Sequence, residues 1–340
     1  MISGLQHRGV PTAVLHSGQH YDRGLNRDIF EALGLAPPDH NLGVGSGSHG
    51  EQSARILQGA AEVFRAQRPG LVLVQGDTNT AMAAALAAVQ LGVRVGHVEA
   101  GLRSFDRRMP EERNRILIDH LATDLYAPTA TAAAHLREEG ITRGVHITGN
   151  TIADVVLAEL RAGSLGADRL APLDARPGRY LLLTAHRPEN VDTAAPLGAL
   201  MDAVDAVARS RDLPALFPCH PRTRARLGAF GLRVPPSVRV LPPLGLHDFL
   251  ALQRHARLVL TDSGGVQEEA CILGVPCVTL RESTERPETV DLGANRVTGL
   301  ATARVLAAVE TLWDASGWEQ PFGSGDAGEQ IAAHAAEALS

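Results

Sequence analysis

The sequence contains no lysine, so every basic side chain other than histidine is an arginine. This absence excludes Schiff-base chemistry and a lysine general base, because both need a side-chain amine. An arginine-only set is also what a GC-rich genome produces, so it says little about the fold. The net charge of −6 argues against a non-specific nucleic-acid binder.

Cysteine and long apolar runs are scarce as well. Three cysteines, Cys219, Cys271 and Cys277, form no CxxC pair. They are typical of small buried apolar residues in a reducing compartment. No apolar run approaches about 18 residues, which argues against a membrane span. Residues 1–10 lack the apolar segment of a signal peptide. We therefore expect a cytoplasmic protein.

What the sequence does contain is an alternation of strands and helices over 340 residues, a length typical of about two domains. Strands are predicted at 12–16, 71–75, 93–98, 124–127 and 145–148, and then at 180–184, 215–219, 238–241, 258–261 and 276–280. Helices are predicted at 1–8, 51–66, 81–91, 110–121, 152–161, 266–273, 301–314 and 329–339, with a loop and helix at 19–33. This order predicts an α/β protein with doubly wound parallel sheets.

The division into domains follows from the irregular stretch 162–178, which mixes Gly, Pro, Asp and Arg without periodicity and is predicted to be a linker. We expect a first Rossmann-like domain at 1–162, joined by the terminal helix 328–340. A second Rossmann-like domain is expected at 179–322. A ligand cleft between two similar α/β halves is the architecture that we infer.

The stretch from Thr261 to Glu269 follows an apolar strand and reads as a small-residue turn at 262–265 and then a helix. This geometry directs backbone N–H groups at an anion, and glycines let a phosphate approach closely. Ser263, Gly264 and Gly265 are therefore candidate phosphate contacts, and a carboxylate within the helix could bind ribose hydroxyls. An ordinary βα connection remains an alternative.

In open α/β sheets, ligands bind outside the carboxyl ends of the strands, and carboxylates of the first half fall at those ends. Asp77 and Glu99 each follow a predicted strand, and Glu111 lies in the first turn of a helix that Pro110 opens. Asp77 could instead only cap the next helix, and acids are common in a first helical turn. Glu99 has no such alternative role, because a loop follows it.

The second half places other polar residues at strand ends. His186 and His220 each follow a predicted strand, and Arg286 follows another. Single histidines there are often packing residues, and Arg286 could belong to a surface ion pair. Taken together, the acids, histidines, arginine and phosphate turn predict one site for a nucleotide-sugar. The histidines are scattered and no DxD spacing is present, which argues against a metal. The Gly-rich stretch 43–50 does not follow a predicted strand, which argues against a dinucleotide-cofactor loop.

These motifs together resemble the non-hydrolysing UDP-N-acetylglucosamine 2-epimerases. The motifs that carry the likeness are Gly18-Gln19-His20, Gln75-Gly76-Asp77-Thr78-Asn79-Thr80, His97-Val98-Glu99-Ala100-Gly101-Leu102-Arg103, Pro110-Glu111-Glu112 with Asn114-Arg115, Gly149-Asn150, His186-Arg187-Pro188-Glu189-Asn190, His220-Pro221, Asp262 to Glu269, and Thr284-Glu285-Arg286-Pro287-Glu288. They span roughly residues 12 to 300 in the order of the family.

The resemblance implies two Rossmann-like domains in a glycosyltransferase-B-like arrangement, with neither a nicotinamide cofactor nor a metal. It implies that UDP leaves C1 as the C2 proton is removed, which gives a bound 2-acetamidoglucal. Re-addition of UDP, with protonation on the other face, then gives the C2 epimer. A homodimer serving polysaccharide or secondary-metabolite biosynthesis, with no nucleic-acid or membrane partner, is the family expectation.

The resemblance also assigns roles. It implies catalytic positions at Asp77, Glu99, Glu111 and His220, without dividing the proton transfers among them. It implies substrate-binding positions at Ser263, Gly264 and Gly265 for the diphosphate, Arg286 as its charged clamp, Glu269 at the ribose, and His186, Arg187 and Asn190. Some bacterial members use the positions of His186 and Arg187 to bind a second, activating substrate molecule.

The sequence departs from the family pattern in two places. Family members open with a strand and a Gly-Thr-Arg-Pro-Glu turn whose arginine contacts the phosphates, whereas Met1 falls in the helix that follows. We therefore expect the first strand to be missing and a sheet edge to be left open. Asp22 replaces a glutamine of the allosteric members, which favours a simpler enzyme without activation by substrate.

Several alternatives stay open at this point. An epimerase of the same mechanism could act on a UDP-diacetamido-glucuronate, whose extra carboxylate would need an arginine such as Arg103, Arg107 or Arg108. A hydrolysing epimerase would release free N-acetylmannosamine. A glycosyltransferase of similar architecture would leave the acids of the first half unexplained. A catalytically impaired nucleotide-sugar binder is the remaining alternative.

Overall fold

The computed structural model describes residues 1–18 and 34–340, which form two compact units. The first unit comprises Met1–Asp154 and Phe322–Ser340, and the second comprises Val155–Pro321. The predicted loop and helix at 19–33, with the motif residues Gln19, His20 and Asp22, lie outside the described residues. No helix in the described ranges is long and apolar enough to cross a membrane.

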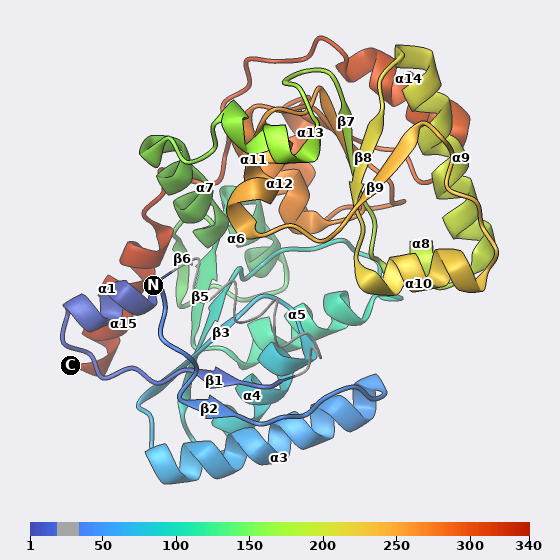
Figure 1. Ribbon diagram of the computed structural model, residues 1–340. Coiled ribbons are helices and arrows are strands. Elements are labelled where there is room, and N and C mark those ends of the chain that lie inside the picture. The colour runs from blue at the N-terminus through green and yellow to red at the C-terminus, as the bar shows by residue number, and fades with distance from the viewer. Residues whose placement is uncertain (19–33) are drawn as a thin grey trace. The chain divides into compact units, whose positions relative to one another are not determined.

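The first unit contains a four-stranded parallel sheet in the order β3-β4-β5-β6 and a separate parallel pair, β1-β2 (Figure 1). Its strands are β1 (Leu15–His16), β2 (His40–Asn41), β3 (Leu71–Gln75), β4 (Arg94–Val98), β5 (Asp124–Ala127) and β6 (Val145–Ile147). Its helices are α1 (Ile2–His7), α3 (His49–Gln67), α4 (Asn79–Gln90), α5 (Pro110–Leu121), α6 (Ala130–Glu138) and α15 (Ala327–Leu339). Helix α7 (Thr151–Ala162) begins in this unit and ends in the second.

Strand β3 lies at an edge of the four-stranded sheet. Within the described ranges β4 is its one strand partner, with Gln75 opposite Val98 at the carboxyl end. After β3, Thr78 caps α4: its hydroxyl accepts a hydrogen bond from the Ala81 amide, 3.2 Å away.

The first and last helices of the chain pack together in the first unit (Figure 1). Leu5 of α1 lies in an apolar cluster with Ala332 and Ala335 of α15. The Asp154 carboxylate accepts hydrogen bonds from the first two amides of α15, at 2.9 and 2.7 Å. A carboxylate at a helix N-terminus is favourable because the unpaired amides and the helix dipole both attract it.

The second unit contains one six-stranded sheet in the order β12-β11-β10-β7-β8-β9, and all neighbours are parallel. Its strands are β7 (Leu181–Thr184), β8 (Ala215–Pro218), β9 (Val238–Leu241), β10 (Leu258–Thr261), β11 (Cys277–Thr279) and β12 (Asn295–Val297). Its helices are η1 (Ala167–Leu173), α8 (Pro188–Val191), α9 (Ala194–Arg211), α10 (Pro221–Ala229), α11 (Leu246–Arg254), α12 (Gly264–Leu273), α13 (Pro287–Asp291) and α14 (Thr302–Leu312). The strand order reverses between β7 and β10, which makes their carboxyl ends the topological switch point.

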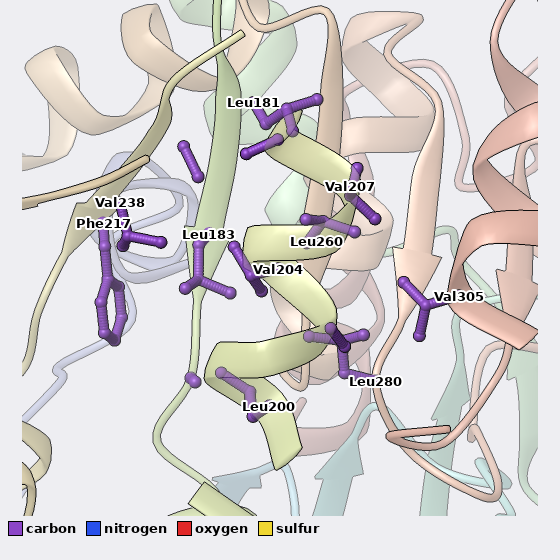
Figure 2. Packing of buried hydrophobic residues seen from close by; sticks show 14 of the residues in the cluster. Leu181, Leu183, Leu200, Val204, Val207, Phe217, Val238, Leu260, Leu280 and Val305 are labelled. Atoms are coloured by element: carbon purple, nitrogen blue, oxygen red, sulfur yellow. The ribbon is translucent and has the colours of Figure 1, made fainter. Parts of the chain in front are cut away.

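Two apolar layers form the core of the second unit, one on each face of the sheet. Leu181 and Leu183 point to the face covered by α9 and α14, where they pack with Val204 of α9 and Val305 of α14 (Figure 2). Leu182, the residue between them, packs in the opposite layer. This alternation explains why the strand is apolar throughout, since both faces of a parallel sheet are covered. The three cysteines are buried and free, as predicted.

The prediction that residues 162–178 form a linker is wrong. The segment contains the 3₁₀ helix η1, and Leu165 and Leu170 are fully buried in it. Leu170 packs in the apolar layer of Tyr180 and Leu182. Tertiary burial of two isolated leucines therefore orders a segment whose local sequence has no helical or strand period.

We predict that glycine is required at Gly101 for space and not only for backbone conformation. Gly101 and Gly140 have nearly equal φ angles, +81° and +82°, but a Cβ at Gly101 would lie 2.2 Å from the Ala132 carbonyl oxygen. A Cβ at Gly140 would meet nothing within 4 Å. Gly140→Ala should lower the free energy of unfolding by about 1–2 kcal/mol, the cost of the left-handed conformation.

Gly101→Ala should cost more than about 4 kcal/mol, because backbone must move as well. Urea unfolding of the two variants measures the difference, with Gly140→Ala as the matched control. Equal losses in the two variants would show that the close approach to α6 is relieved without cost.

Candidate functional site

The carboxyl edge of β3 and β4 brings the first two predicted acids to one place. Because Gln75 lies opposite Val98, Asp77 and Glu99 leave neighbouring strands at the same edge. The Gly76 amide donates to the Val98 carbonyl oxygen at 3.0 Å. A Cβ at Gly76 would lie 3.9 Å from Oε2 of Glu99, so the Glu99 carboxylate borders the residue before Asp77.

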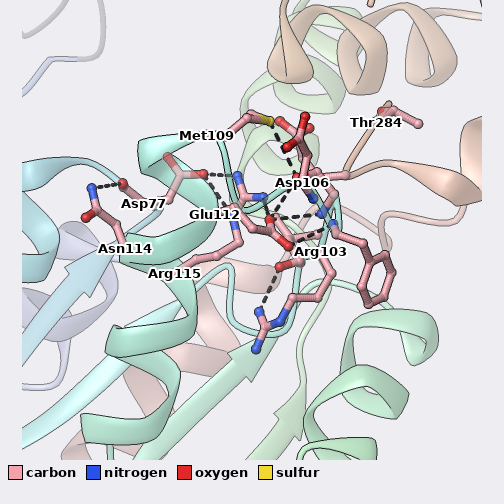
Figure 3. Close-up of polar contacts among 12 residues, drawn as sticks. Asp77, Arg103, Asp106, Met109, Glu112, Asn114, Arg115 and Thr284 are labelled. Atoms are coloured by element: carbon pink, nitrogen blue, oxygen red, sulfur yellow. Dashed lines mark hydrogen bonds and ion pairs between the residues drawn. The ribbon is translucent and has the colours of Figure 1, made fainter. Parts of the chain in front are cut away.

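Asp77 is held by two residues of α5. Its carboxylate accepts hydrogen bonds from the guanidinium of Arg115, one of them from Nε at 3.1 Å, and its carbonyl oxygen accepts from Nδ2 of Asn114 at 2.9 Å (Figure 3). Arg115 is fully buried, whereas the Asp77 side chain is partly exposed. The residue that caps α4 is Thr78, so capping does not account for the Asp77 carboxylate.

Glu99 has a backbone conformation that is unusual for its residue type. Its φ angle is +70°, in the left-handed region, and such a conformation costs about 1–3 kcal/mol in a residue other than glycine. Its Oε1 accepts a hydrogen bond from Nε2 of Gln75 at 2.9 Å. Residues held in strained conformations cluster at functional sites, and nothing in the sequence indicated this one.

The adjacent acids of α5 have different surroundings. Glu112 is buried and accepts from the amide and hydroxyl of Ser104, both at 3.0 Å, from the Phe105 amide at 2.8 Å, and from Nη1 of Arg115 at 2.6 Å (Figure 3). It therefore fixes the loop that follows β4. Glu111 is half-buried in the first turn of the same helix. Of the two acids, Glu111 stays the predicted catalytic residue.

A buried network lies behind this edge. His97 contacts an acceptor with each ring nitrogen: Nδ1 lies 2.6 Å from the Asp119 carboxylate and Nε2 lies 2.9 Å from the Gly76 carbonyl oxygen. His97 is therefore held between the two acceptors. Asp119 also accepts from the Gly101 amide at 3.2 Å and from Arg103 at 2.7 Å. Burial favours a raised pKa for Asp119, but attraction to His97 and Arg103 outweighs it and lowers the pKa.

In the second unit, Asp262 organises the switch point between β7 and β10. The carboxylate is fully buried and accepts from the His186 amide at 3.1 Å, the Arg187 amide at 3.0 Å and Nδ2 of Asn190 at 3.1 Å. Nδ1 of His186 lies 3.2 Å from the same carboxylate. Burial favours a raised pKa for Asp262, but His186 and the amide donors outweigh it and lower the pKa.

Three of the predicted substrate-binding residues thus surround one carboxylate. The His186 side chain is about half exposed, whereas Asn190 is buried. The Asn190 amide nitrogen also donates to the Leu280 carbonyl oxygen at 3.0 Å. Asn190 therefore links the ends of two strands, and its contribution to the site includes fixing the loop that carries His186 and Arg187.

The N-terminus of α12 forms the candidate anion site. Ser263 is the N-cap, and its hydroxyl accepts from the Val266 amide at 3.5 Å. Gly264 and Gly265 belong to the first helical turn, so the prediction of a turn at 262–265 followed by a helix from 266 placed the helix start too late. The earlier start places the amides of Gly264 and Gly265 at the helix N-terminus, where unpaired amides bind anions.

Glycine is needed at Gly264 because another segment packs against it. A Cβ there would lie 2.8 Å from Oε1 of Glu285 and 3.8 Å from Cζ of Arg286. Arg286 is buried and its Nε pairs with Glu268, which excludes a surface ion pair. The loop after β11 thus places a buried arginine beside the N-terminus of α12.

Two further arginines pair with Glu285 in this region. Nη1 of Arg281 lies 2.9 Å from its carboxylate, and Nη2 of Arg187 lies 3.5 Å from it. With Arg286 and Glu268, these side chains form a cluster of three cations and two carboxylates. Its net positive charge next to a helix N-terminus is suited to a dianion such as a diphosphate.

Glu269 lies one residue beyond Glu268 on α12. Burial and the neighbouring Glu268 raise the pKa of Glu269 to about 8. Among the described residues, no hydrogen-bond donor contacts its buried Oε2 atom. A protonated acid with an unsatisfied oxygen is expensive to bury, which makes it a candidate for a ligand contact.

His220 caps α10 and thereby has its ring orientation fixed. Its Nδ1 accepts a hydrogen bond from the Arg222 amide at 3.2 Å, so Nδ1 is unprotonated and the ring is the neutral Nε2–H form. The side chain is exposed. The predicted catalytic histidine is thus a neutral imidazole that can donate from Nε2.

Gln75, Asn114 and Arg115 belong to the sequence motifs, but the sequence predicted no role for them. Asp119 was not predicted at all. The signal was present in part, because Gln75 lies at a strand end and Asn114 and Arg115 lie in the first turns of α5. Asp119 lies near the end of that helix and had no such signal. The contact between Asp119 and Arg103 joins residues 16 apart, and that between Arg115 and Asp77 joins residues 38 apart; no local pattern identifies such contacts.

We predict opposite outcomes for the two neighbouring acids of α5. Glu112→Gln should lower the free energy of unfolding by about 2–3 kcal/mol, because it weakens hydrogen bonds to a buried charge. Glu111→Gln, the matched control one residue earlier, should change it by less than about 1 kcal/mol. Urea unfolding monitored by circular dichroism measures both. A loss in Glu111→Gln as large as that in Glu112→Gln would contradict this assignment.

Comparisons with known proteins agree with this geometry. The family model described as UDP-N-acetylglucosamine 2-epimerase matches residues 4–336. A UDP-N-acetylglucosamine 2-epimerase of Methanococcus maripaludis is 44% identical over 94% of this chain and 89% of its own length. A UDP-2,3-diacetamido-2,3-dideoxy-D-glucuronate 2-epimerase of Pseudomonas aeruginosa is 37% identical over 98% of this chain and 93% of its own length.

Among solved structures, the UDP-GlcNAc 2-epimerase of Methanocaldococcus jannaschii in complex with UDP-GlcNAc and UDP has a TM-score of 0.94 and 42% identity. The match covers 99% of this chain and 94% of that one. The predicted two Rossmann-like parallel-sheet domains are therefore confirmed. The sequence, the fold and the residues at the sheet edges lead to one conclusion: the chain belongs to the UDP-N-acetylglucosamine 2-epimerase family.

Proposed function

We propose that the chain interconverts UDP-N-acetylglucosamine and UDP-N-acetylmannosamine without net hydrolysis. The observation that carries the proposal is the pair of carboxylates, Asp77 and Glu99, at one sheet edge of the first unit. Asp77 is held by a buried arginine, and Glu99 is held in a strained conformation. Acid–base chemistry needs carboxylates positioned in this way, and simple sugar binding does not.

The proposed reaction has two steps. A base removes the C2 proton while UDP departs from C1 with the electron pair of the C1–O bond, which gives 2-acetamidoglucal. UDP then re-adds to C1 as an acid delivers a proton to the other face of C2. Asp77, Glu99, Glu111 and the neutral imidazole of His220 are the groups that we propose for these proton transfers.

The second unit supplies the nucleotide contacts in this proposal. The amides at Gly264 and Gly265, the hydroxyl of Ser263 and the guanidinium of Arg286 hold the diphosphate and stabilise it as it leaves. Glu269 accepts hydrogen bonds from the ribose. His186, Arg187 and Asn190, which Asp262 holds together, complete the substrate-binding residues.

The surroundings of two of the three candidate arginines favour this substrate over a diacetamido uronic acid. The extra carboxylate of the uronate would need a cation from Arg103, Arg107 or Arg108. Arg103 is buried and bound to Asp119 and Glu139, and Arg108 pairs with Asp106. Two of the three candidate cations are therefore already paired. Incubation with each nucleotide-sugar in turn decides between the substrates.

We predict that UDP-N-acetylglucosamine incubated with the enzyme in D₂O gains deuterium at C2 and forms the manno epimer, as followed by proton NMR. Asp77→Asn and Glu99→Gln should each lower turnover by about 10²- to 10⁴-fold, because each removes a proton-transfer group. Binding of UDP should survive in both. Asp106→Asn, which changes an acid in the neighbouring loop, is the control and should retain activity.

Wild-type rates in both Asp77→Asn and Glu99→Gln would refute the assignment of the acids. Binding of UDP without deuterium exchange in the wild type would indicate a nucleotide-sugar binder instead. Release of free N-acetylmannosamine would indicate a hydrolysing epimerase, and transfer of the sugar to an added acceptor would indicate a glycosyltransferase.

We predict that UDP binding releases a proton from Glu269. Its raised pKa, about 8, means that the free protein carries Glu269 mainly protonated at pH 7. Ribose hydroxyls donate to a carboxylate and favour the charged form, so binding lowers the pKa and expels the proton. UDP affinity should therefore rise with pH up to about 8 and then level off.

Calorimetric titrations of UDP in buffers of different ionisation enthalpy measure the proton release. The release should approach one proton per site at pH 7 and vanish in Glu269→Gln. An unchanged release in Glu269→Gln would show that another group titrates. This result would leave the epimerase proposal intact, because it concerns the nucleotide contact alone.

We further propose that the protein is a cytoplasmic homodimer, as expected for the family. Light scattering coupled to size-exclusion chromatography tests the dimer directly. A mass that stays at one chain across the concentration range would overturn it.

A further inference from the structure

A second cluster of polar side chains lies in the first unit, on a face of the sheet that α15 covers. Asp124 begins β5, His146 lies in β6 and His334 lies in α15. One ligand atom from each of these residues can be chosen so that all three atoms lie within 4.8 Å of one another. The three residues are far apart in the sequence, so no local spacing of metal ligands reveals them.

The sheet register explains how they meet. Tyr126 of β5 lies opposite His146 of β6, and Asp124 is two residues before Tyr126, so all three side chains share one face. On that face Tyr126 packs with Ile331 of α15. His334 follows Ile331 by one helical turn, which brings its ring to within 3.9 Å of the His146 ring, centroid to centroid.

We propose that Asp124, His146 and His334 form a binding site for one zinc-like divalent transition-metal ion that fastens α15 to the sheet. Two imidazoles and one carboxylate are a common zinc ligand set with one position left for water. Imidazole nitrogen favours such ions over Mg²⁺ and Ca²⁺, which prefer oxygen. This proposal is independent of the proposed reaction, whose acids lie at the opposite ends of the strands.

The ring nitrogens of the two histidines are placed to act as ligands. In the described part of the chain, no residue hydrogen-bonds to either nitrogen of the His146 ring. Nδ1 of His334 lies 3.0 Å from the Tyr126 hydroxyl, which leaves Nε2 of that ring as the available ligand atom.

Supporting contacts around the cluster are of the kind that orient metal ligands. A ligating histidine usually donates its second N–H to an oxygen, and the Tyr126 hydroxyl is placed to accept from His334. Asp124 is buried and accepts from Nε and Nη2 of Arg94, both at 2.7 Å. A carboxylate has about four lone-pair positions, so these two bonds leave room for a metal.

Geometry and charge set the expected strength. Ligand atoms of a tetrahedral zinc ion with bonds of about 2.0–2.1 Å lie about 3.4 Å apart, so separations of up to 4.8 Å must close by about 1.4 Å at most. Side-chain rotation supplies such a movement. Arg94 already balances the charge of Asp124, so a divalent ion adds net positive charge. We therefore expect binding in the micromolar range and not the tighter binding of a preformed structural zinc site.

The test uses the untagged, full-length protein freed of metal with a chelator. Titration with Co²⁺ should give visible absorption bands that saturate at one equivalent. Zn²⁺ at about a hundredfold excess over its dissociation constant should raise the midpoint of thermal unfolding by about 5–10 °C. His146→Gln and His334→Gln should each lose both effects. His7→Gln, which removes an exposed histidine from α1, is the matched control and should keep them.

The unfolding midpoint of each metal-free variant is measured first, so that loss of metal binding is distinguished from loss of folding. A variant that unfolds at the wild-type temperature without metal, yet no longer responds to Zn²⁺, supports the site. Unchanged Co²⁺ spectra in both variants, or a wild-type midpoint that Zn²⁺ does not move, would overturn it.

Discussion

The constraint on which both halves of the structure depend is that a buried carboxylate must be surrounded by donors. Asp119 in the first unit and Asp262 in the second are each almost completely buried. Leaving either charge unpaired would cost several kcal/mol. Each is satisfied by donors at or just beyond the carboxyl ends of the strands, so burying the carboxylate also positions the loops there.

In the first unit, this requirement fixes the two loops that carry Asp77 and Glu99. Asp119 binds the Gly101 amide and His97, and His97 binds the Gly76 carbonyl oxygen. Asp77 and Glu99 each adjoin one of these anchored segments. The left-handed backbone of Glu99 thus lies between segments that buried contacts hold in place.

Much of the fold was accessible from the sequence because local patterns determine it. The bounds of β5, β9, β10 and α5 agree with the prediction to the residue, since apolar runs end in turns and Pro110 opens a helix. The short strand β12 was not predicted, because the three residues of Asn295–Val297 carry too little pattern. The packing of 162–178 escaped detection because it depends on distant partners.

In the candidate site, too, local patterns predicted the residues but not the contacts between distant segments. Strand ends identified Asp77, Glu99, His186, His220 and Asp262 without any coordinates. The pairing of Asp77 with Arg115 joins residues 38 apart, and the contact of Asp262 with the His186 amide joins residues 76 apart. Such contacts depend on strand order, which the sequence does not state. The protonated state of Glu269 likewise follows from burial that only the folded helix creates.

The packing of α15 against α1 has a consequence for how the protein is made. The second unit is continuous along the chain, whereas the first is closed by residues 322–340. During synthesis on the ribosome, the second unit can therefore complete its sheet while the first still lacks the helix that covers Tyr126. Domains fold as they emerge, and exposed apolar surface invites aggregation. The first unit therefore keeps apolar surface exposed until α15 has been made, and it is the unit with the greater need of protection by chaperones.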